Sequence, residues 1–180
     1  MKKIFHLNLK LLTILLFTIM STKTVKANKS NFITLKTSKG SIVIKTLPKI
    51  APNHVKRIKD LVSSGFYNGI IFHRVIEGFM AQTGDPLGNG TGGSGRNLKA
   101  EFSDYKYKYG TVGMARSMNP DSGDSQFFIC FDGCGHLTGQ YTVWGQVETG
   151  MEVVEKIEIG EPPSNPDQII EAFVGKKKTK

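Results

Sequence analysis

The sequence predicts a mainly β domain, in which a closed eight-stranded antiparallel β-barrel is capped by two α-helices. About eight short runs rich in β-branched and aromatic residues are separated by turn residues, and the two segments with helical periodicity lie far apart in the chain. The 20 glycines and seven prolines also favour many turns. The 180 residues show no internal repeat, so a single domain is expected.

The first two predicted strands form a hairpin. Residues 32–37 and 41–46 are rich in β-branched side chains, and Ser38-Lys39-Gly40 lies between them. Alternate residues of a strand point to opposite sides, so one of Phe127 and Phe128 should pack in the core while the other lines a groove. Further strands are expected at 70–76, at a short segment ending at Gln82, and at 111–115, 127–131, 141–147 and 168–174.

The two predicted helices cover the stretch from Pro52 to Gly65 and residues 150–159. Proline inside the start of a helix and glycine just past its end are typical of helix boundaries. The apolar residues that recur at helical spacing are Val55, Ile58, Leu61 and Val62 in the first helix, and Met151, Val154 and Ile157 in the second.

The formal net charge of +9 is concentrated at the two ends of the chain. Five lysines and no acidic residue lie in the first 27 residues, and four lysines lie in residues 176–180. The body between them is formally neutral, which argues against a nucleic-acid-binding protein.

Residues 1–27 have the features of an export signal. Lys2 and Lys3 precede an apolar stretch over residues 11–20, and Val25-Lys26-Ala27 offers small residues for cleavage. The apolar stretch is about half of the ~20 residues that a membrane-spanning helix needs, so a cleaved signal is favoured over an anchor, with an uncleaved or lipid-tethered form as the alternative. We therefore expect an exported, periplasmic protein with a mature domain over 28–175, a basic tail at 176–180 and no other membrane association.

The only cysteines are Cys130 and Cys134. They could pair in an oxidising compartment, but a loop this short would strain the bond, and Cys130 ends the apolar run 127–129, where a buried thiol behaves as a small hydrophobe. Free thiols are therefore expected. The four histidines and two cysteines show no zinc-binding spacing, so neither a metal nor a cofactor is expected.

The segment from residue 72 to residue 85 carries the most informative polar residue. Arg74 lies on a largely apolar strand, where a guanidinium is costly to bury unless it reaches a carboxylate or a water-accessible groove. A surface arginine, or one paired with an acidic neighbour, is the alternative. Residues 88–93 fit the pattern G-x-G-x-x-G, but no helical period follows them, so a dinucleotide site is not supported.

Several segments together resemble the cyclophilin family of peptidyl-prolyl cis/trans isomerases, and they occur in the family's order. The resemblance covers most of residues 32–174 and implies a cyclophilin-like barrel. The matching pieces are Phe72-His73-Arg74-Val75-Ile76, Gly78-Phe79-Met80-Ala81-Gln82-Thr83-Gly84-Asp85, Gly90-Thr91-Gly92-Gly93, residues 110–115, Ser125-Gln126-Phe127-Phe128-Ile129, and residues 137–145.

The resemblance implies catalysis of rotation about Xaa-Pro bonds in proline-containing polypeptides, and in an exported protein it implies assistance to folding. Arg74 and Gln82 would be catalytic, with Gln82 also helping to orient Arg74. A monomer is expected, and a peptide-binding chaperone on the same fold is the alternative. The implied substrate-binding residues are Phe79, Met80, Ala115, Arg116, Gln126, Phe128, His136, Leu137 and Tyr141.

Three of these positions depart from the pattern of many cyclophilins. Arg116 stands where many carry asparagine, Tyr141 where many carry histidine, and His136 where some carry tryptophan. Members without that tryptophan tend to bind cyclosporin poorly, so weak inhibition is expected. Trp144 lies elsewhere, on a predicted strand, and is expected in the core.

Overall fold

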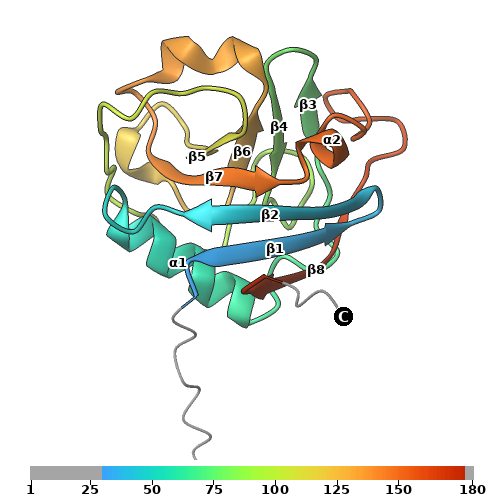
Figure 1. The fold of residues 1–180 in the computed structure, drawn as a ribbon, viewed down its shortest axis with the longest axis horizontal. Coiled ribbons are helices and arrows are strands. Elements are labelled where there is room, and N and C mark those ends of the chain that lie inside the picture. Colours follow the sequence, from blue (N-terminus) through green and yellow to red (C-terminus); the bar gives the residue numbers. More distant parts are fainter. Residues whose placement is uncertain (1–29, 177–180) are drawn as a thin grey trace, which may run out of the picture.

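A computed structural model describes residues 30–176, which form one sheet with helices packed against it (Figure 1). The predicted signal peptide and residues 177–180 of the predicted tail lie outside the described residues. The eight strands are β1 (Phe32–Thr37), β2 (Gly40–Thr46), β3 (Arg74–Ile76), β4 (Met80–Thr83), β5 (Thr111–Met114), β6 (Phe127–Cys130), β7 (Val143–Thr149) and β8 (Ile169–Val174).

The sheet is antiparallel and strongly curled, but it is open, so the prediction of a closed barrel is wrong. Its strand order is β3-β4-β6-β5-β7-β2-β1-β8, which leaves β3 and β8 as the two edges. The segment just before β3 meets the segment around the start of β8 only through isolated contacts, such as the bridge between Ile71 and Gln168. The predicted strand at 70–76 is therefore shortened to three residues. Its first half makes isolated backbone hydrogen bonds and no continuous ladder with a neighbouring strand.

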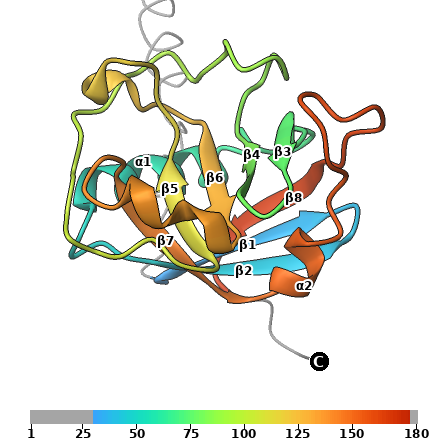
Figure 2. The same cartoon turned by 90° about the horizontal axis from the view of Figure 1, so that it is seen from above.

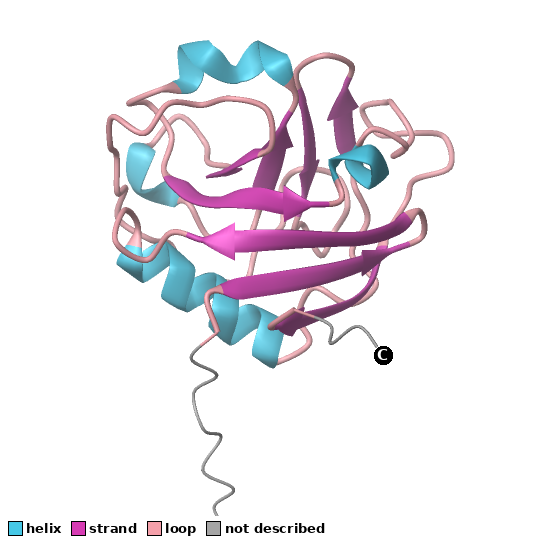
Figure 3. Cartoon of the chain, in the orientation of Figure 1, coloured by secondary structure: helices cyan, strands magenta, loops and turns pink. Residues whose placement is uncertain are grey.

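Helix α1 (Pro52–Ser63) confirms the first predicted helix, and its apolar stripe is buried against the sheet. The second predicted helix is reduced to one turn, α2 (Met151–Val154). The chain turns away after it, and Gly160 then pairs with Val75 of β3. Two short 3₁₀ helices, Pro120–Ser122 and Asp132–Leu137, were not predicted (Figure 3).

The core separates into two apolar clusters on opposite sides of β6. Phe127 packs edge-on against Trp144, with ring centroids 5.3 Å apart, and both side chains are buried as predicted. Phe128 points the other way into a smaller cluster with Met80, Leu137 and four other buried residues. The alternation predicted for the two phenylalanines is confirmed, and the smaller cluster forms the floor of the site described below.

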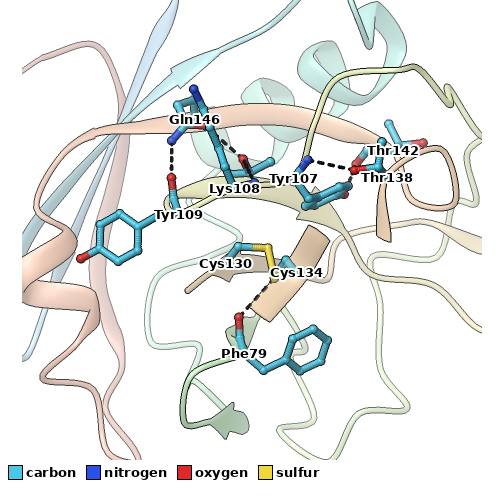
Figure 4. Close-up of a disulfide and its surroundings, with 10 residues drawn as sticks. Phe79, Tyr107, Lys108, Tyr109, Cys130, Cys134, Thr138, Thr142 and Gln146 are labelled. Atoms are coloured by element: carbon cyan, nitrogen blue, oxygen red, sulfur yellow. Dashed lines mark hydrogen bonds between the residues drawn. A yellow bond between two sulfur atoms is a disulfide. The ribbon is translucent and has the colours of Figure 1, made fainter. Parts of the chain in front are cut away.

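Cys130 and Cys134 form a disulfide, so the expectation of free thiols is wrong (Figure 4). The 3₁₀ helix Asp132–Leu137 folds the chain back so that the two Cα atoms are 6.0 Å apart, within the usual range for a disulfide. A loop this short can hold the bond because the turn brings the two cysteines together. The disulfide ties β6 to the 3₁₀ helix that carries His136 and Leu137.

No helix among residues 30–176 is long and apolar enough to cross a membrane. Lys176, the first residue of the predicted basic tail, lies against the domain: its Nζ is 3.1 Å from a Glu148 carboxylate oxygen and 4.0 Å from the centroid of the Phe32 ring.

Candidate active site

A pocket of about 280 Å³ opens above strands β3, β4 and β6. The residues that line it come from those strands, from the loop after β5, and from the 3₁₀ helix Asp132–Leu137 and the residues after it. The structure thus brings together ten of the eleven predicted site residues. The lining residues are Arg74, Phe79, Met80, Gln82, Ala115, Arg116, Phe128, His136, Leu137 and Tyr141.

Strand register explains why the central residues meet. Arg74 on β3 lies opposite Gln82 on β4, and Gln82 lies opposite Phe128 on β6. Directly opposed residues of antiparallel strands place their side chains on the same face, so these three form one row across the sheet. The next residue in the row is Gly113 on β5, where a Cβ atom would lie 2.5 Å from the Phe128 ring. Glycine at this position leaves room for the ring.

The floor of the pocket is apolar and well packed. Met80, Phe128 and Leu137 are 1%, 4% and 8% exposed, and Phe79 is half-buried beside them. Behind Phe128 lies the Tyr107 ring, stacked with its centroid 5.8 Å away. Such a floor can accept a small apolar ring and exclude water from it.

Arg74 supplies the charge at the rim. Its Nε donates a hydrogen bond to a Glu161 carboxylate oxygen at 2.6 Å, and its side chain is 39% exposed. Among the described residues, its terminal nitrogens donate no hydrogen bond, so they are available to a ligand. Glu161 was not among the predicted site residues; its sequence position, 87 residues after Arg74, gave no signal of the contact.

Among the described residues, Gln82 makes no hydrogen bond to Arg74, and its expected orienting role stays a prediction. Its Nε2 instead donates to Gln126 Oε1 at 2.9 Å. Gln126 in turn donates to the carbonyl oxygens of Gly90 and Gly92, at 3.0 and 2.8 Å. Gln126 lies outside the main pocket, in an adjoining pocket of about 290 Å³ that Gln82 also lines. The two glutamines therefore join the strands to the glycine-rich loop.

The glycine-rich loop is held by Asp85 and forms part of the wall of this adjoining pocket. The buried Asp85 carboxylate accepts backbone N–H bonds from Leu87, Asn89 and Gly90 at 2.8, 3.0 and 2.6 Å. Burial raises the pKa of Asp85, but these bonds outweigh it and hold the pKa below its ordinary value.

Arg116 holds neighbouring chain segments rather than pointing freely into the pocket. Its guanidinium lies over the Tyr141 ring, 4.3 Å from the centroid, and donates to the carbonyl oxygens of Ser117 and Gln140 at 2.9 and 3.0 Å. The Ala115 N–H bonds the Gln126 carbonyl at 2.9 Å. On the other side of the pocket, the exposed His136 ring stacks on Phe79 with centroids 5.5 Å apart.

His73, which precedes Arg74, is a buried neighbour that sequence reasoning left out of the site. It is 4% exposed and lines a third cavity, of about 390 Å³, behind Arg74. Burial lowers the pKa of His73, although the nearby Asp85 charge opposes the shift. The imidazole is therefore neutral at neutral pH and adds no charge beside Arg74.

A pocket with an apolar floor and Arg74 at its rim can bind an apolar ring and donate hydrogen bonds to the polar group beside it. Residues 32–174 match the model of the family "Cyclophilin type peptidyl-prolyl cis-trans isomerase/CLD". The chain belongs to the cyclophilin family. It is therefore a cyclophilin-type peptidyl-prolyl cis-trans isomerase, as the sequence motifs predicted.

Relatives and solved structures agree with this assignment. The cyclophilin is 49% identical over 165 residues to a probable peptidyl-prolyl cis-trans isomerase of Brucella abortus, covering 82% of this chain and 84% of the relative. It is 44% identical over 137 residues to the peptidyl-prolyl cis-trans isomerase of Helicobacter pylori, covering 74% and 83%. A crystal structure of a cyclophilin-type isomerase from Cryptosporidium parvum, determined in the presence of the dipeptide Ala-Pro, matches with a TM-score of 0.75 and 29% identity, covering 81% of this chain and 99% of that one.

Proposed function

We propose that this cyclophilin isomerises Xaa-Pro bonds by seating the prolyl ring on Phe79, Met80, Phe128 and Leu137 and holding the adjoining amide with Arg74. The observation that carries the proposal is the placement of unpaired guanidinium N–H groups of Arg74 at the rim of a pocket with an apolar floor. The cyclophilin-type structure from Cryptosporidium parvum, obtained with Ala-Pro present, supports a proline dipeptide as the ligand.

The chemistry requires no bond to break. Rotation about a peptide bond faces a barrier of ~18–20 kcal/mol, because resonance gives the C–N bond double-bond character. Twisting the prolyl amide removes that resonance and localises the lone pair on its nitrogen, which can then accept a hydrogen bond. Hydrogen bonds from Arg74, directed at the twisted amide rather than the planar one, lower the barrier. A rate gain of ~10⁵-fold requires about 7 kcal/mol, which a few preorganised contacts can supply.

The polar side of the pocket would hold the substrate backbone on either side of the proline. Gln82 is fixed by Gln126, so it offers its free carbonyl oxygen in a defined place. Backbone groups near Ala115 and the glycine-rich wall add hydrogen-bonding positions for an extended chain. Arg116 acts on this surface by holding Tyr141 over the pocket.

We further propose that the protein is exported to the periplasm, where as a monomer it assists the folding of other exported proteins. The basic and apolar N-terminal segment supports this location. The Cys130–Cys134 disulfide supports it as well, because disulfides persist in oxidising compartments and are rare in the cytosol. Cell fractionation, with mass spectrometry of the mature N-terminus, tests it: a periplasmic form beginning near Asn28 is expected, and an uncleaved cytoplasmic chain would contradict it.

Titration of the purified protein with a short Ala-Pro peptide, followed by NMR, tests the site. The peptide should shift the Met80 methyl and Phe128 ring resonances, and exchange peaks between its cis and trans forms should appear. As a control, the Ile42 and Ile44 methyl groups, buried in the other core cluster, should not shift. Binding at the pocket without exchange peaks would contradict the catalytic role and favour a peptide-binding chaperone.

A further inference from the structure

We propose that Glu161 is a positioning residue for catalysis, which fixes Arg74 so that its terminal nitrogens face the prolyl pocket. The inference rests on the proposed function of Arg74. It starts from the 2.6 Å hydrogen bond between Arg74 Nε and the Glu161 carboxylate. Charge-assisted bonds of this length are among the strongest available to an arginine side chain.

Backbone pairing places Glu161 beside Arg74. Val75 and Gly160 form an antiparallel bridge through two hydrogen bonds, of 2.8 and 3.0 Å. In antiparallel pairing, the residue before Val75 and the residue after Gly160 are the next opposed pair, and their side chains share a face. In Figure 2 the connection between α2 and β8 rises next to β3. The pair is therefore set by the fold rather than by a chance contact of long side chains.

The loop that presents Glu161 is braced at both ends. Gly160 has a φ of +152°, and a Cβ atom there would lie 2.6 Å from Pro163 Cα, so this tight turn requires glycine. The buried Asp167 carboxylate accepts bonds from the Glu158 N–H at 2.9 Å and from the Ser38 hydroxyl at 2.6 Å. These contacts hold the backbone of Glu161 close to Arg74, so the two side chains lose little additional conformational freedom when they pair.

Glu161 binds Arg74 from outside the proposed prolyl pocket. Arg74 lines both the prolyl pocket and the 390 Å³ cavity behind it, whereas Glu161 and Pro162 line only the cavity. The carboxylate thus accepts the hydrogen bond from Nε and leaves the two terminal amino groups of Arg74 to a ligand. A guanidinium free to rotate would reach the same position for only part of the time, and small misplacements of catalytic groups are costly in rate.

The pair should matter more for rate than for stability. The Arg74 and Glu161 side chains are 39% and 53% exposed. Ion pairs with this exposure contribute little to folding free energy, since water and salt screen them. A loss of activity without a loss of stability is therefore the expected signature of a positioning role.

The test compares wild type with Glu161→Ala, Glu161→Gln and the control Glu152→Ala, which removes an exposed carboxylate on α2. Turnover and KM for an Ala-Pro peptide are measured by NMR exchange, together with the water-exchange rate of the Arg74 Nε–H, assigned by its absence in Arg74→Ala. We expect Glu161→Ala to lower kcat about tenfold with KM within about twofold, and to expose the Nε–H to faster exchange. Glu161→Gln keeps an acceptor and should recover much of the rate. Glu152→Ala should match wild type.

Wild-type kcat in Glu161→Ala, or a rate loss accompanied by an equal fall in melting temperature, would overturn the inference while leaving the proposed function intact. An unchanged Nε–H exchange rate in Glu161→Ala would overturn it as well. Wild-type protein that binds the peptide but does not isomerise it would instead remove the proposed function, and the inference with it.

Discussion

The Arg116 guanidinium lies over the Tyr141 ring, 4.3 Å from its centroid, and the same ring makes a T-shaped contact with Phe128, with the centroids 5.8 Å apart. Arg116 therefore acts on the proposed prolyl pocket through Tyr141. A cation over an aromatic face contributes about 0.5–1 kcal/mol at an exposed site, and the two carbonyl bonds of Arg116 add to the restraint.

We expect Arg116→Ala to raise KM for an Ala-Pro peptide about threefold to tenfold, with a smaller change in kcat, because the wall of the pocket loosens. Arg116→Lys should recover only part of the effect, since an ammonium cannot bond both carbonyls in the same geometry. NMR exchange kinetics supply both parameters. An unchanged KM in Arg116→Ala would show that Tyr141 holds its position without the guanidinium.

Reduction of the Cys130–Cys134 disulfide should destabilise the domain. Closing a loop of this length stabilises a protein by about 2 kcal/mol in the chain-entropy model, which corresponds to a fall in melting temperature of roughly 4–8 °C for a domain of this size. Thermal unfolding followed by circular dichroism, with and without dithiothreitol, measures the change. The double variant Cys130→Ala/Cys134→Ala serves as the control, because its melting temperature should not respond to the reductant.

Glu101 should make stability depend on acidic pH. Its carboxylate accepts bonds from the backbone N–H groups of Asn53 and His54 at 3.1 and 3.0 Å, and lies 2.6 Å from the buried His54 Nδ1. Burial raises the pKa of Glu101, but the bonds from His54 and Asn53 outweigh it and hold the pKa below its ordinary value. The contribution of the Glu101 carboxylate to the free energy of unfolding is therefore present above the unfolded-state pKa of about 4.3. It is lost as the pH falls through the lower folded-state pKa.

Glu101→Gln should cost about 1–3 kcal/mol of unfolding free energy at pH 7 and flatten the loss of stability below about pH 4. Urea unfolding at a series of pH values measures both effects. Glu152→Gln, on the exposed side of α2, should leave the curve unchanged. An acid transition as steep in Glu101→Gln as in wild type would assign the pH dependence to other carboxylates, Asp85 first among them.

Cyclosporin should bind weakly, because His136 occupies the place of a tryptophan found in some cyclophilins. The imidazole stacks on Phe79 at the pocket rim and offers less apolar surface than an indole. His136→Trp should therefore tighten binding by about tenfold or more, as measured by titration calorimetry. Micromolar or tighter binding by the wild-type protein would contradict the expectation.

The sequence was sufficient for the elements whose signals are local. Strands such as β1 and β2 have clear β-branched runs, α1 has its proline and apolar stripe, and Phe127 and Phe128 alternate as predicted. The pocket residues were predicted from family motifs rather than from periodicity. What was missed depends on contacts between distant segments or on an unforeseen turn.

Three misses illustrate this. The contact between Glu161 and Arg74 requires the β-bridge between Val75 and Gly160, which no local sequence pattern predicts. The disulfide depends on the 3₁₀ turn after β6, and its glycine-rich sequence gives no strong helical signal. The sheet is open because its two edge strands are joined only by isolated backbone hydrogen bonds. The number of predicted strands is the same for an open sheet and for a closed barrel.

The proposed catalytic role of Arg74 is tested most directly by the turnover of an Ala-Pro peptide in wild type, Arg74→Ala and Arg74→Lys, with Arg96→Ala as an exposed control outside the proposed prolyl pocket. We expect kcat to fall by about two orders of magnitude or more in Arg74→Ala and substantially in Arg74→Lys, since the planar multi-donor group is lost in both. Melting temperatures should stay close to wild type, and Arg96→Ala should be fully active. Full turnover by a folded Arg74→Ala protein would contradict the account.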